Sequence, residues 1–249
     1  IIGSFNLAKD LKKYNFDKIF IFNSSFRFNI IAKIAGIKDI HQYKLFDKKN
    51  QHIINAAKNF IKKEINLVVE SNPKISVDKE LIKESKIKYN INENQVNILL
   101  GIGGSGMTKR IPSRIFIQSM ELISKKYDCR FFLATGKNEE EQKILSDILI
   151  TQFKDKCIAL DNLSLKEILP IIKNCKIAIC NDSSFSHLSS ALGIETIVLM
   201  SDTPLLYGSY SPKMHPIIPD GEEHVTHDTM GKNRINSNKI FSKLKNIID

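Results

Sequence analysis

The sequence is poor in cysteine. Its 249 residues include four cysteines, with no CxxC pair and no disulfide-dense spacing. Such usage is unlike that of a structural zinc domain or a small secreted disulfide scaffold, and it fits a reducing compartment. The four residues lie in or beside apolar, strand-like segments: Cys129, Cys157, Cys175 and Cys180.

The sequence also lacks a long apolar run. The longest runs, such as residues 19–22 and 197–200, are strand-sized, whereas a membrane-spanning helix needs about 18 apolar residues. Residues 1–13 lack the basic start, apolar middle and small-residue exit of a secretion signal. We therefore expect a cytoplasmic chain that does not span a bilayer. Because residue 1 is isoleucine, we also expect the chain to be part of a longer protein.

Acidic residues are fewer than basic ones. The 37 Lys and Arg against 27 Asp and Glu give a formal net charge of +10, which favours phosphate-bearing partners: nucleotides, nucleic acid or an anionic membrane. Lysine is nevertheless spread along the whole chain, and neither an RNA-binding aromatic signature nor a helix-turn-helix pattern is present. We interpret most lysines as solvated surface and expect no nucleic-acid partner, although a basic nucleic-acid binder remains a rival interpretation.

From residue 96 onward, apolar strand patterns alternate with amphipathic helical patterns. This alternation predicts an α/β fold with a parallel, doubly wound sheet. The apolar runs are continuous, as expected for strands buried on both faces. Strands are expected at residues 96–103, 130–136, 157–161, 176–182 and 195–200, and helices at 113–126, 139–150, from about 164, at 184–192 and at 238–248.

The N-terminal part of the sequence predicts fewer regular elements. A strand at residues 18–23 precedes a helical pattern that ends at Gly36, and residues 50–63 are typical of an amphipathic helix. Residues 71–95 contain a pre-proline segment, polar residues and one charged helix. We expect a partial N-terminal domain over 1–70, a linker over 71–95 and a C-terminal domain over 96–249.

The glycine-rich segment at residues 101–112, GIGGSGMTKRIP, follows a strand and precedes a helix. Glycines such as Gly104 let backbone N–H groups approach an anion closely, and the next helix offers its positive end. Lys109 and Arg110 supply positive charge, and Thr108 supplies a hydroxyl donor. The segment therefore predicts a site for a diphosphate.

Other glycine motifs compete with this interpretation. Met107 stands where a Walker A loop needs lysine, which disfavours a P-loop nucleotidase. Gly101, Gly103 and Gly106 satisfy GxGxxG, so a Rossmann-type oxidoreductase stays open, although no acidic residue ends the next strand, where a ribose would be held. A purely structural glycine turn and a nucleotide-binding module without catalysis also stay open.

A second candidate segment, residues 181–192 or NDSSFSHLSSAL, follows an apolar strand. We expect Asp182, Ser183 and Ser184 to cap a helix at the carboxyl edge of the sheet, where ligands of open α/β sheets bind. His187 lies one turn further in. An ordinary helix cap and a hydrogen-bonded core histidine would give the same residues, and the glycine-rich segment is what favours a ligand site.

A third segment, residues 220–228 or DGEEHVTHD, places His224 and His227 beside acidic residues. It lacks the HExxH pattern of helical zinc sites. We interpret it as a solvated loop that approaches a substrate and expect no metal ion. A GxSxG nucleophile elbow is also missing from the sequence.

The order of these motifs resembles glycosyltransferase family 9, the lipopolysaccharide heptosyltransferases of GT-B fold. Residues 109–112, KRIP, are similar to the family's Lys-basic-aromatic-Pro motif, with Ile111 in place of tryptophan. Residues 181–200 are similar to its Asp-Thr/Ser-Gly-x-x-His-Leu-x-x-Ala-x-Gly stretch, with Ser184 in place of glycine. The residues that keep this register are Asp182, Ser183, His187 and Gly193.

The resemblance extends over nearly the whole chain. Residues 14–28 are similar to the family's early strand and Arg-containing helix, and residues 201–212 to its donor-site loop. It implies two Rossmann-like domains with parallel sheets, the N-terminal one incomplete. The family's catalytic base is an aspartate in an opening Gly-Asp loop, which we expect upstream of Ile1. Weaker matches in the donor-site loop are Tyr207, Gly208 and Pro212.

The resemblance implies an inverting reaction. A base deprotonates an acceptor hydroxyl, which attacks the anomeric carbon while ADP departs, with no metal or other cofactor. Preorganised positive charge and N–H donors stabilise such a leaving group, and Lys109, Thr108 and the helix starting at Ser183 are placed to supply them. The family contacts the nucleoside near Gly136, where either Glu139 or Glu140 could hold the ribose. Exposed glutamates in the first turn of a helix would give the same residues.

The implied substrates are ADP-heptose, or a related nucleotide-diphosphate sugar, and a lipopolysaccharide core acceptor. Because that acceptor is amphiphilic and anionic, the positive net charge is expected to hold the protein on the cytoplasmic face of the inner membrane as a peripheral, monomeric enzyme. The motifs do not encode which sugar is transferred.

Overall fold

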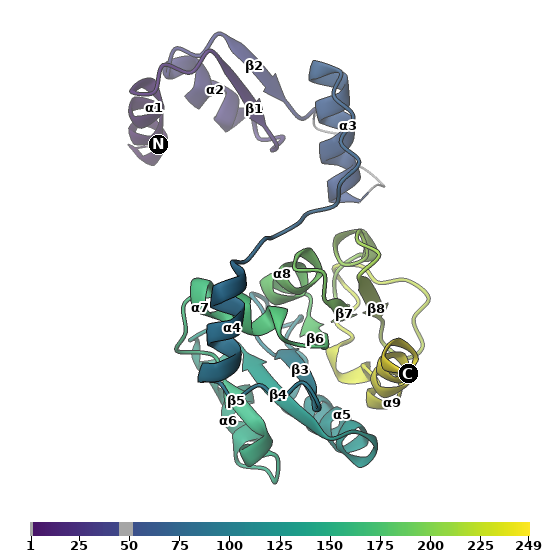
Figure 1. Cartoon of the computed structure of the whole chain (residues 1–249). Helices are drawn as coiled ribbons and strands as arrows, with labels where there is room; N and C mark the ends of the chain where they lie inside the picture. The colour runs from purple at the N-terminus through teal and green to yellow at the C-terminus, as the bar shows by residue number, and fades with distance from the viewer. Residues whose placement is uncertain (1, 45–51) are drawn as a thin grey trace. The chain divides into compact units, whose positions relative to one another are not determined.

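The computed structural model describes residues 2–44 and 52–249. The contacts of its backbone divide the chain into two compact units, Ile1–Ser71 and Asn72–Asp249 (Figure 1). Within the described ranges, no helix is both long and apolar enough to cross a membrane.

The first unit is built on a two-stranded parallel sheet, in which Lys18 lies opposite Asp39 and Ile21 opposite Gln42. Its core gathers small and aliphatic side chains, among them Ala8 and Ile31. Its elements are α1 (Ile2–Lys12), β1 (Lys18–Ile21), α2 (Phe26–Ile34), β2 (Asp39–Gln42) and α3 (Ile53–Ile65). Sequence patterns predicted β1, α2 and α3 but neither α1 nor β2, and the expected start of α3 at residues 50 and 51 lies outside the described residues.

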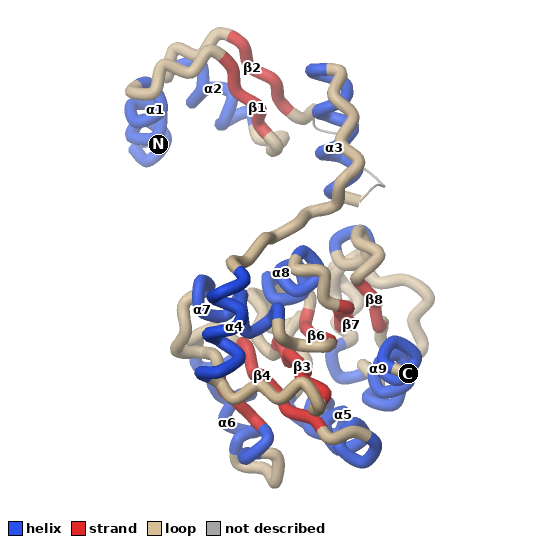
Figure 2. Tube along the Cα trace, viewed as in Figure 1, coloured by secondary structure: helices blue, strands red, loops and turns tan. Residues whose placement is uncertain are grey.

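The second unit contains a six-stranded sheet with the order β5-β4-β3-β6-β7-β8, in which every neighbouring pair is parallel. Figure 2 shows strands of this unit in red and its helices in blue. Numbered within this unit, the order is 3-2-1-4-5-6, that of the doubly wound Rossmann fold. The strands are β3 (Val96–Gly101), β4 (Cys129–Ala134), β5 (Cys157–Ala159), β6 (Ile177–Asn181), β7 (Glu195–Leu199) and β8 (Met214–Ile217).

Helices cover both faces of this sheet. Successive strand residues point to opposite faces, so Ile98 and Leu100 join a core with α5 and α9, whereas Leu99 packs in a second core with α7. This arrangement explains why the central strands are apolar at every position. The helices are α4 (Lys79–Lys88), α5 (Ser113–Lys126), α6 (Glu139–Leu149), α7 (Leu165–Lys173), α8 (Ser184–Ala191) and α9 (Ser237–Ile248).

Two features differ from the sequence-based expectation. The edge strand β8 was not anticipated, because it is short and contains Pro216, a residue that sheets tolerate at their edges. The expected linker of residues 71–95 contributes α4 to the second unit, since the side-chain amide of Asn174 donates to the Ile82 carbonyl over 3.0 Å and to the Ser85 hydroxyl over 2.9 Å.

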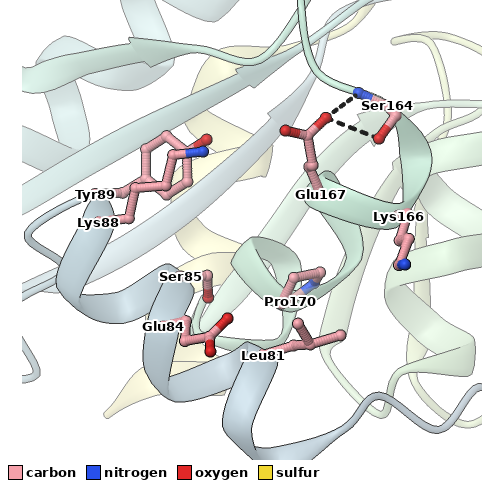
Figure 3. A pocket seen from close by; sticks show the side chains of 9 residues that line it. All are labelled: Leu81, Glu84, Ser85, Lys88, Tyr89, Ser164, Lys166, Glu167 and Pro170. Carbon is pink, nitrogen blue, oxygen red and sulfur yellow. Dashed lines mark hydrogen bonds between the residues drawn. The ribbon is translucent and has the colours of Figure 1, made fainter.

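A pocket of about 410 Å³ lies between α4 and α7 (Figure 3). Three of its polar residues serve the fold itself. The Glu167 carboxylate accepts hydrogen bonds from the backbone and hydroxyl of Ser164, which closes a capping box at the start of α7. The Ser85 hydroxyl donates to the Ile82 carbonyl. We assign this pocket no ligand.

Candidate functional site

The polar candidates lie where the order of the strands reverses. β3 pairs with β4 on one side and with β6 on the other, so the segments after β3 and β6 leave the same sheet edge from neighbouring strands. Crevices at such positions are the usual ligand sites of open α/β sheets. Here the two segments are the glycine-rich loop, defined as residues 102–112, and the start of α8.

The two segments meet through an ion pair. Lys109 Nζ lies 2.7 Å from Asp182 Oδ2. The Asp182 side chain is 5% exposed and that of Lys109 is 28% exposed, so the carboxylate is buried while the ammonium still reaches water. Because an ammonium group carries three N–H donors, one directed at Asp182 leaves others for a ligand.

Ser183 is the N-cap residue of α8 but does not cap it with its side chain. Its hydroxyl is buried and makes no hydrogen bond within the described protein. The sequence-based expectation that Asp182 and the serines cap this helix is therefore wrong, since the Asp182 carboxylate turns to Lys109. The first N–H groups of a helix have no partner within it, so this helix start offers donors to an anion.

A pocket of about 480 Å³ opens between these segments and the loop after β4. Inside it, the Thr135 hydroxyl is a buried donor and acceptor without a partner in the described protein, which is the property expected of a group that meets a polar ligand. The residues lining the pocket are Gly103, Gly104, Ser105, Thr135, Gly136, Asn138, Glu141, Ser183, Ser184 and Phe185.

Glu141 is the main residue that sequence reasoning missed. Its side chain is buried in the first turn of α6, and Oε1 accepts a hydrogen bond of 2.6 Å from the Gly104 N–H. The Asn138 amide donates to its other oxygen. A Cβ atom at Gly103 or Gly136 would collide with this carboxylate, so these glycines make room for it.

The expected nucleoside residues are only partly at the pocket. Gly136 lines it, whereas Glu139 and Glu140 do not; both are exposed, and Glu140 forms an ion pair with Arg110. The acidic residue that faces the pocket is one or two positions later in the same helical turn. The segment's three consecutive glutamates carried no signal that singled out the buried one.

Asn181 also escaped the sequence analysis. It is fully buried at the end of β6, and its amide donates to the carbonyls of Ile102 and Gly103 over 2.8 Å and 3.2 Å. This side chain ties the glycine-rich loop to the neighbouring strand. A polar residue that ends a continuous apolar strand was the available signal.

His187 lies one turn into α8, as expected, but it is not among the residues that line the pocket. Its Nδ1 lies 2.8 Å from the Tyr210 hydroxyl, and the two rings stack. Burial lowers the pKa of His187 below its ordinary value, Asp182 opposes this shift and Lys109 adds to it. The imidazole is therefore neutral at pH 7.

Two glycines among the remaining candidates have structural roles. A Cβ atom at Gly208 would collide with Met200, and the ring of Tyr207 lies 6.1 Å from that of His227. Gly193 follows α8 with φ +81°, a left-handed conformation that favours glycine. Among the described residues, 2–44 and 52–249, no three His, Cys, Asp or Glu side chains are grouped so that they could hold a metal ion.

Comparison with known proteins identifies the family. The family described as glycosyltransferase family 9 (heptosyltransferase) matches residues 4–234. The chain belongs to glycosyltransferase family 9. A lipopolysaccharide heptosyltransferase 1 from Campylobacter coli is 28% identical over 153 residues, which are 59% of this chain and 44% of that protein. The match thus spans less than half of the length of that relative.

Solved structures confirm the predicted GT-B-like fold. E. coli ADP-heptose lipopolysaccharide heptosyltransferase II has a TM-score of 0.74 at 18% identity, covering 99% of this chain and 81% of that one. A family 9 glycosyl transferase from Veillonella parvula gives 0.73 at 15% identity, with 98% and 77% covered. An E. coli heptosyltransferase solved with ADP gives 0.71 at 13% identity, with 99% and 77% covered. At these identities the likeness shows the fold alone.

Proposed function

We propose that this chain is part of an inverting heptosyltransferase that moves a heptose, or a related sugar, from an ADP-activated donor to a lipopolysaccharide core acceptor. The observation that carries the proposal is the meeting of Lys109 and Asp182 at the point where the strand order reverses, beside a pocket with unpartnered polar groups. Family membership supports the reaction class.

In this proposal the donor nucleotide spans the glycine-rich loop. The nucleoside occupies the pocket, where the Glu141 carboxylate and the Thr135 hydroxyl meet the ribose hydroxyls. The diphosphate lies toward Lys109, Thr108 and the Ser183 hydroxyl at the start of α8. Buried polar groups gain most from a ligand that completes their hydrogen bonds, so the pocket favours a sugar-bearing nucleotide over an apolar molecule.

The chemistry requires a stabilised leaving group. The bond between the anomeric carbon and the β-phosphate oxygen breaks, and negative charge grows on the departing diphosphate as the acceptor oxygen forms its bond on the opposite face. Lys109 and the free N–H groups of α8 would meet that charge, held in place before the reaction. Removing one such donor typically costs about 10² to 10³ in rate. A general base takes up the proton that the acceptor hydroxyl loses.

The acceptor and its location belong to the same proposal. A lipopolysaccharide core is anionic and amphiphilic, and the net charge of +10 would hold the protein against the cytoplasmic face of the inner membrane. Co-sedimentation with vesicles tests this part. Binding that rises with the anionic lipid content supports it, and binding that is insensitive to anionic lipid contradicts it.

Ligand-dependent thermal stability tests the donor site. ADP at about 100 times its dissociation constant would stabilise the fold by about 2.7 kcal/mol, and we expect UDP, NAD and RNA to do less. Lys109→Ala and Asp182→Ala should abolish the ADP effect. Because the strand order is also that of dinucleotide-binding enzymes, stabilisation by NAD alone would instead support an oxidoreductase.

A further inference from the structure

The glycine-rich loop is held at two places by different groups. Its front half, residues 102–104, is fixed by Asn181 and by Glu141, which bonds the Gly104 N–H. Its back half, residues 107–109, carries Thr108 and Lys109, which the proposed function assigns to the diphosphate. The front half lines the nucleoside pocket, so the two halves serve different parts of the ligand.

The back half is held from the far end of the chain. The Ser201 hydroxyl donates to the Thr108 carbonyl over 2.8 Å, and Lys232 Nζ donates to the Met107 carbonyl over 2.8 Å. These two bonds engage consecutive peptide groups directly before Lys109. Met107 is 63% exposed, so packing of its side chain contributes little to fixing this part of the loop.

The segment that carries Lys232 is itself anchored by Asp202. This aspartate is buried, and its Oδ1 accepts a hydrogen bond of 2.6 Å from the Met230 N–H. The next N–H, that of Gly231, donates to the Ser201 carbonyl over 2.9 Å. Asp202 and Ser201 thus accept hydrogen bonds from the successive N–H groups of Met230 and Gly231, directly before Lys232.

The backbone at this anchor is held in a costly conformation. Met230 has φ +47°, in the left-handed region that a non-glycine residue rarely adopts. A Cβ atom at Gly231 would collide with the ring of Pro219, so the turn fits its surroundings closely. A residue keeps such a conformation only where its neighbours determine it, and Asp202 supplies the bond that does so.

We infer that Asp202 and Lys232 are positioning residues for the diphosphate, a role that rests on the proposed function. Asp202 fixes Met230 beside the Ser201 carbonyl that holds Gly231, and Lys232 then reaches the Met107 carbonyl. The back half of the loop is thereby held so that Lys109 meets both Asp182 and the ligand. Neither positioning residue contacts the nucleotide itself. Substitution of either residue should therefore weaken the binding of the diphosphate and leave the binding of the nucleoside nearly unchanged.

Calorimetric titration of the full chain with ADP and with adenosine tests this inference. We expect Asp202→Ala and Lys232→Met each to weaken ADP binding about tenfold, the equivalent of one lost hydrogen bond of about 1.4 kcal/mol, while adenosine binding changes less than about twofold. Asp202→Asn keeps an oxygen that accepts the Met230 N–H and should restore ADP binding. Lys245→Met, on the exposed side of α9, is the matched control and should bind like the wild type.

The outcomes separate the two proposals. A wild-type chain that binds neither ligand overturns the proposed function and this inference with it. A wild type that binds ADP while both variants bind it equally well overturns the inference alone, and so does an equal loss of ADP and adenosine binding. If Asp202→Ala does not fold, Lys232→Met decides the question, because Lys232 forms an exposed hydrogen bond whose loss leaves the core intact.

Discussion

The ammonium nitrogen of Lys109 and a carboxylate oxygen of Asp182 lie 2.7 Å apart, although the two residues are 73 positions apart in the sequence. Each follows a strand of the same sheet, and those strands are neighbours. The pair therefore joins the two halves of the doubly wound unit at the edge where such folds bind their ligands.

The ion pair predicts that substitutions of Lys109 and Asp182 have non-additive effects on the free energy of unfolding. Lys109→Met leaves the buried Asp182 carboxylate without its partner, which should lower the free energy of unfolding by about 1 to 3 kcal/mol; the partial exposure of Lys109 keeps the loss below that of a fully buried pair. Adding Asp182→Asn removes the unpaired charge and should recover part of the loss. Urea denaturation of the two single variants and the double variant measures the coupling, and strictly additive losses would contradict it.

Glu141, and not Glu139, should decide nucleoside binding. Glu141→Ala removes the buried carboxylate that accepts from the Gly104 N–H and lines the pocket, so we expect adenosine and ADP affinity to fall together by about tenfold or more. Glu139→Ala, in the same turn but exposed, is the matched control. Equal affinities of the two variants in a calorimetric titration would show that the pocket does not hold the nucleoside.

Two adjacent glycines should respond differently to the same substitution. A Cβ atom at Gly103 would meet the Glu141 carboxylate and the Thr135 backbone, whereas one at Gly104 comes no closer than 3.6 Å, to the Arg110 side chain. We therefore expect Gly103→Ala to cost about 1 to 3 kcal/mol of stability, as overpacked sites do. Gly104→Ala should be tolerated. Thermal unfolding of both variants checks this, and similar melting temperatures would contradict the close approach of Glu141 to Gly103.

Much of the second unit could be predicted from the sequence, because its four central strands are buried on both faces and so are apolar at nearly every position. β6 and β7 show this most clearly, with every residue but Glu195 buried. The edge strand β8 could not be recognised, since Pro216 and His215 interrupt its apolar character. The membership of residues 72–95 in the second unit was also hidden, because α4 is charged and joins that unit through contacts with Asn174 far along the chain.

The candidate site was predictable where a side chain stands in a motif that follows a strand, and unpredictable where tertiary contacts select the side chain. Lys109 and Asp182 stand in recognisable motifs after β3 and β6. The choice of Glu141 among three glutamates depends on which face of α6 meets the glycine-rich loop. The roles of Asp202 and Lys232 depend on contacts with residues 230 and 107, which no local pattern encodes.

His187 should make the stability pH-dependent. Its pKa lies below the ordinary value of 6.5 chiefly because it is buried, so the unfolded chain takes up a proton at a higher pH than the folded one. The contribution of the neutral His187 imidazole to the free energy of unfolding is fully present above about pH 6.5, and it is lost as the pH falls through the lowered pKa. Urea denaturation at pH 7.5 and 5.5 should show a smaller loss for His187→Asn than for the wild type. The exposed His224→Asn should behave like the wild type, and equal losses in all three would contradict the buried, neutral imidazole.

A crystal structure of the chain with bound ADP tests the central claim most directly. The account predicts the adenosine in the pocket beside Glu141 and the β-phosphate within hydrogen-bonding distance of Lys109 Nζ and the first N–H groups of α8. ADP bound at any other place on the chain, with Lys109 and Asp182 left facing only each other, would contradict it.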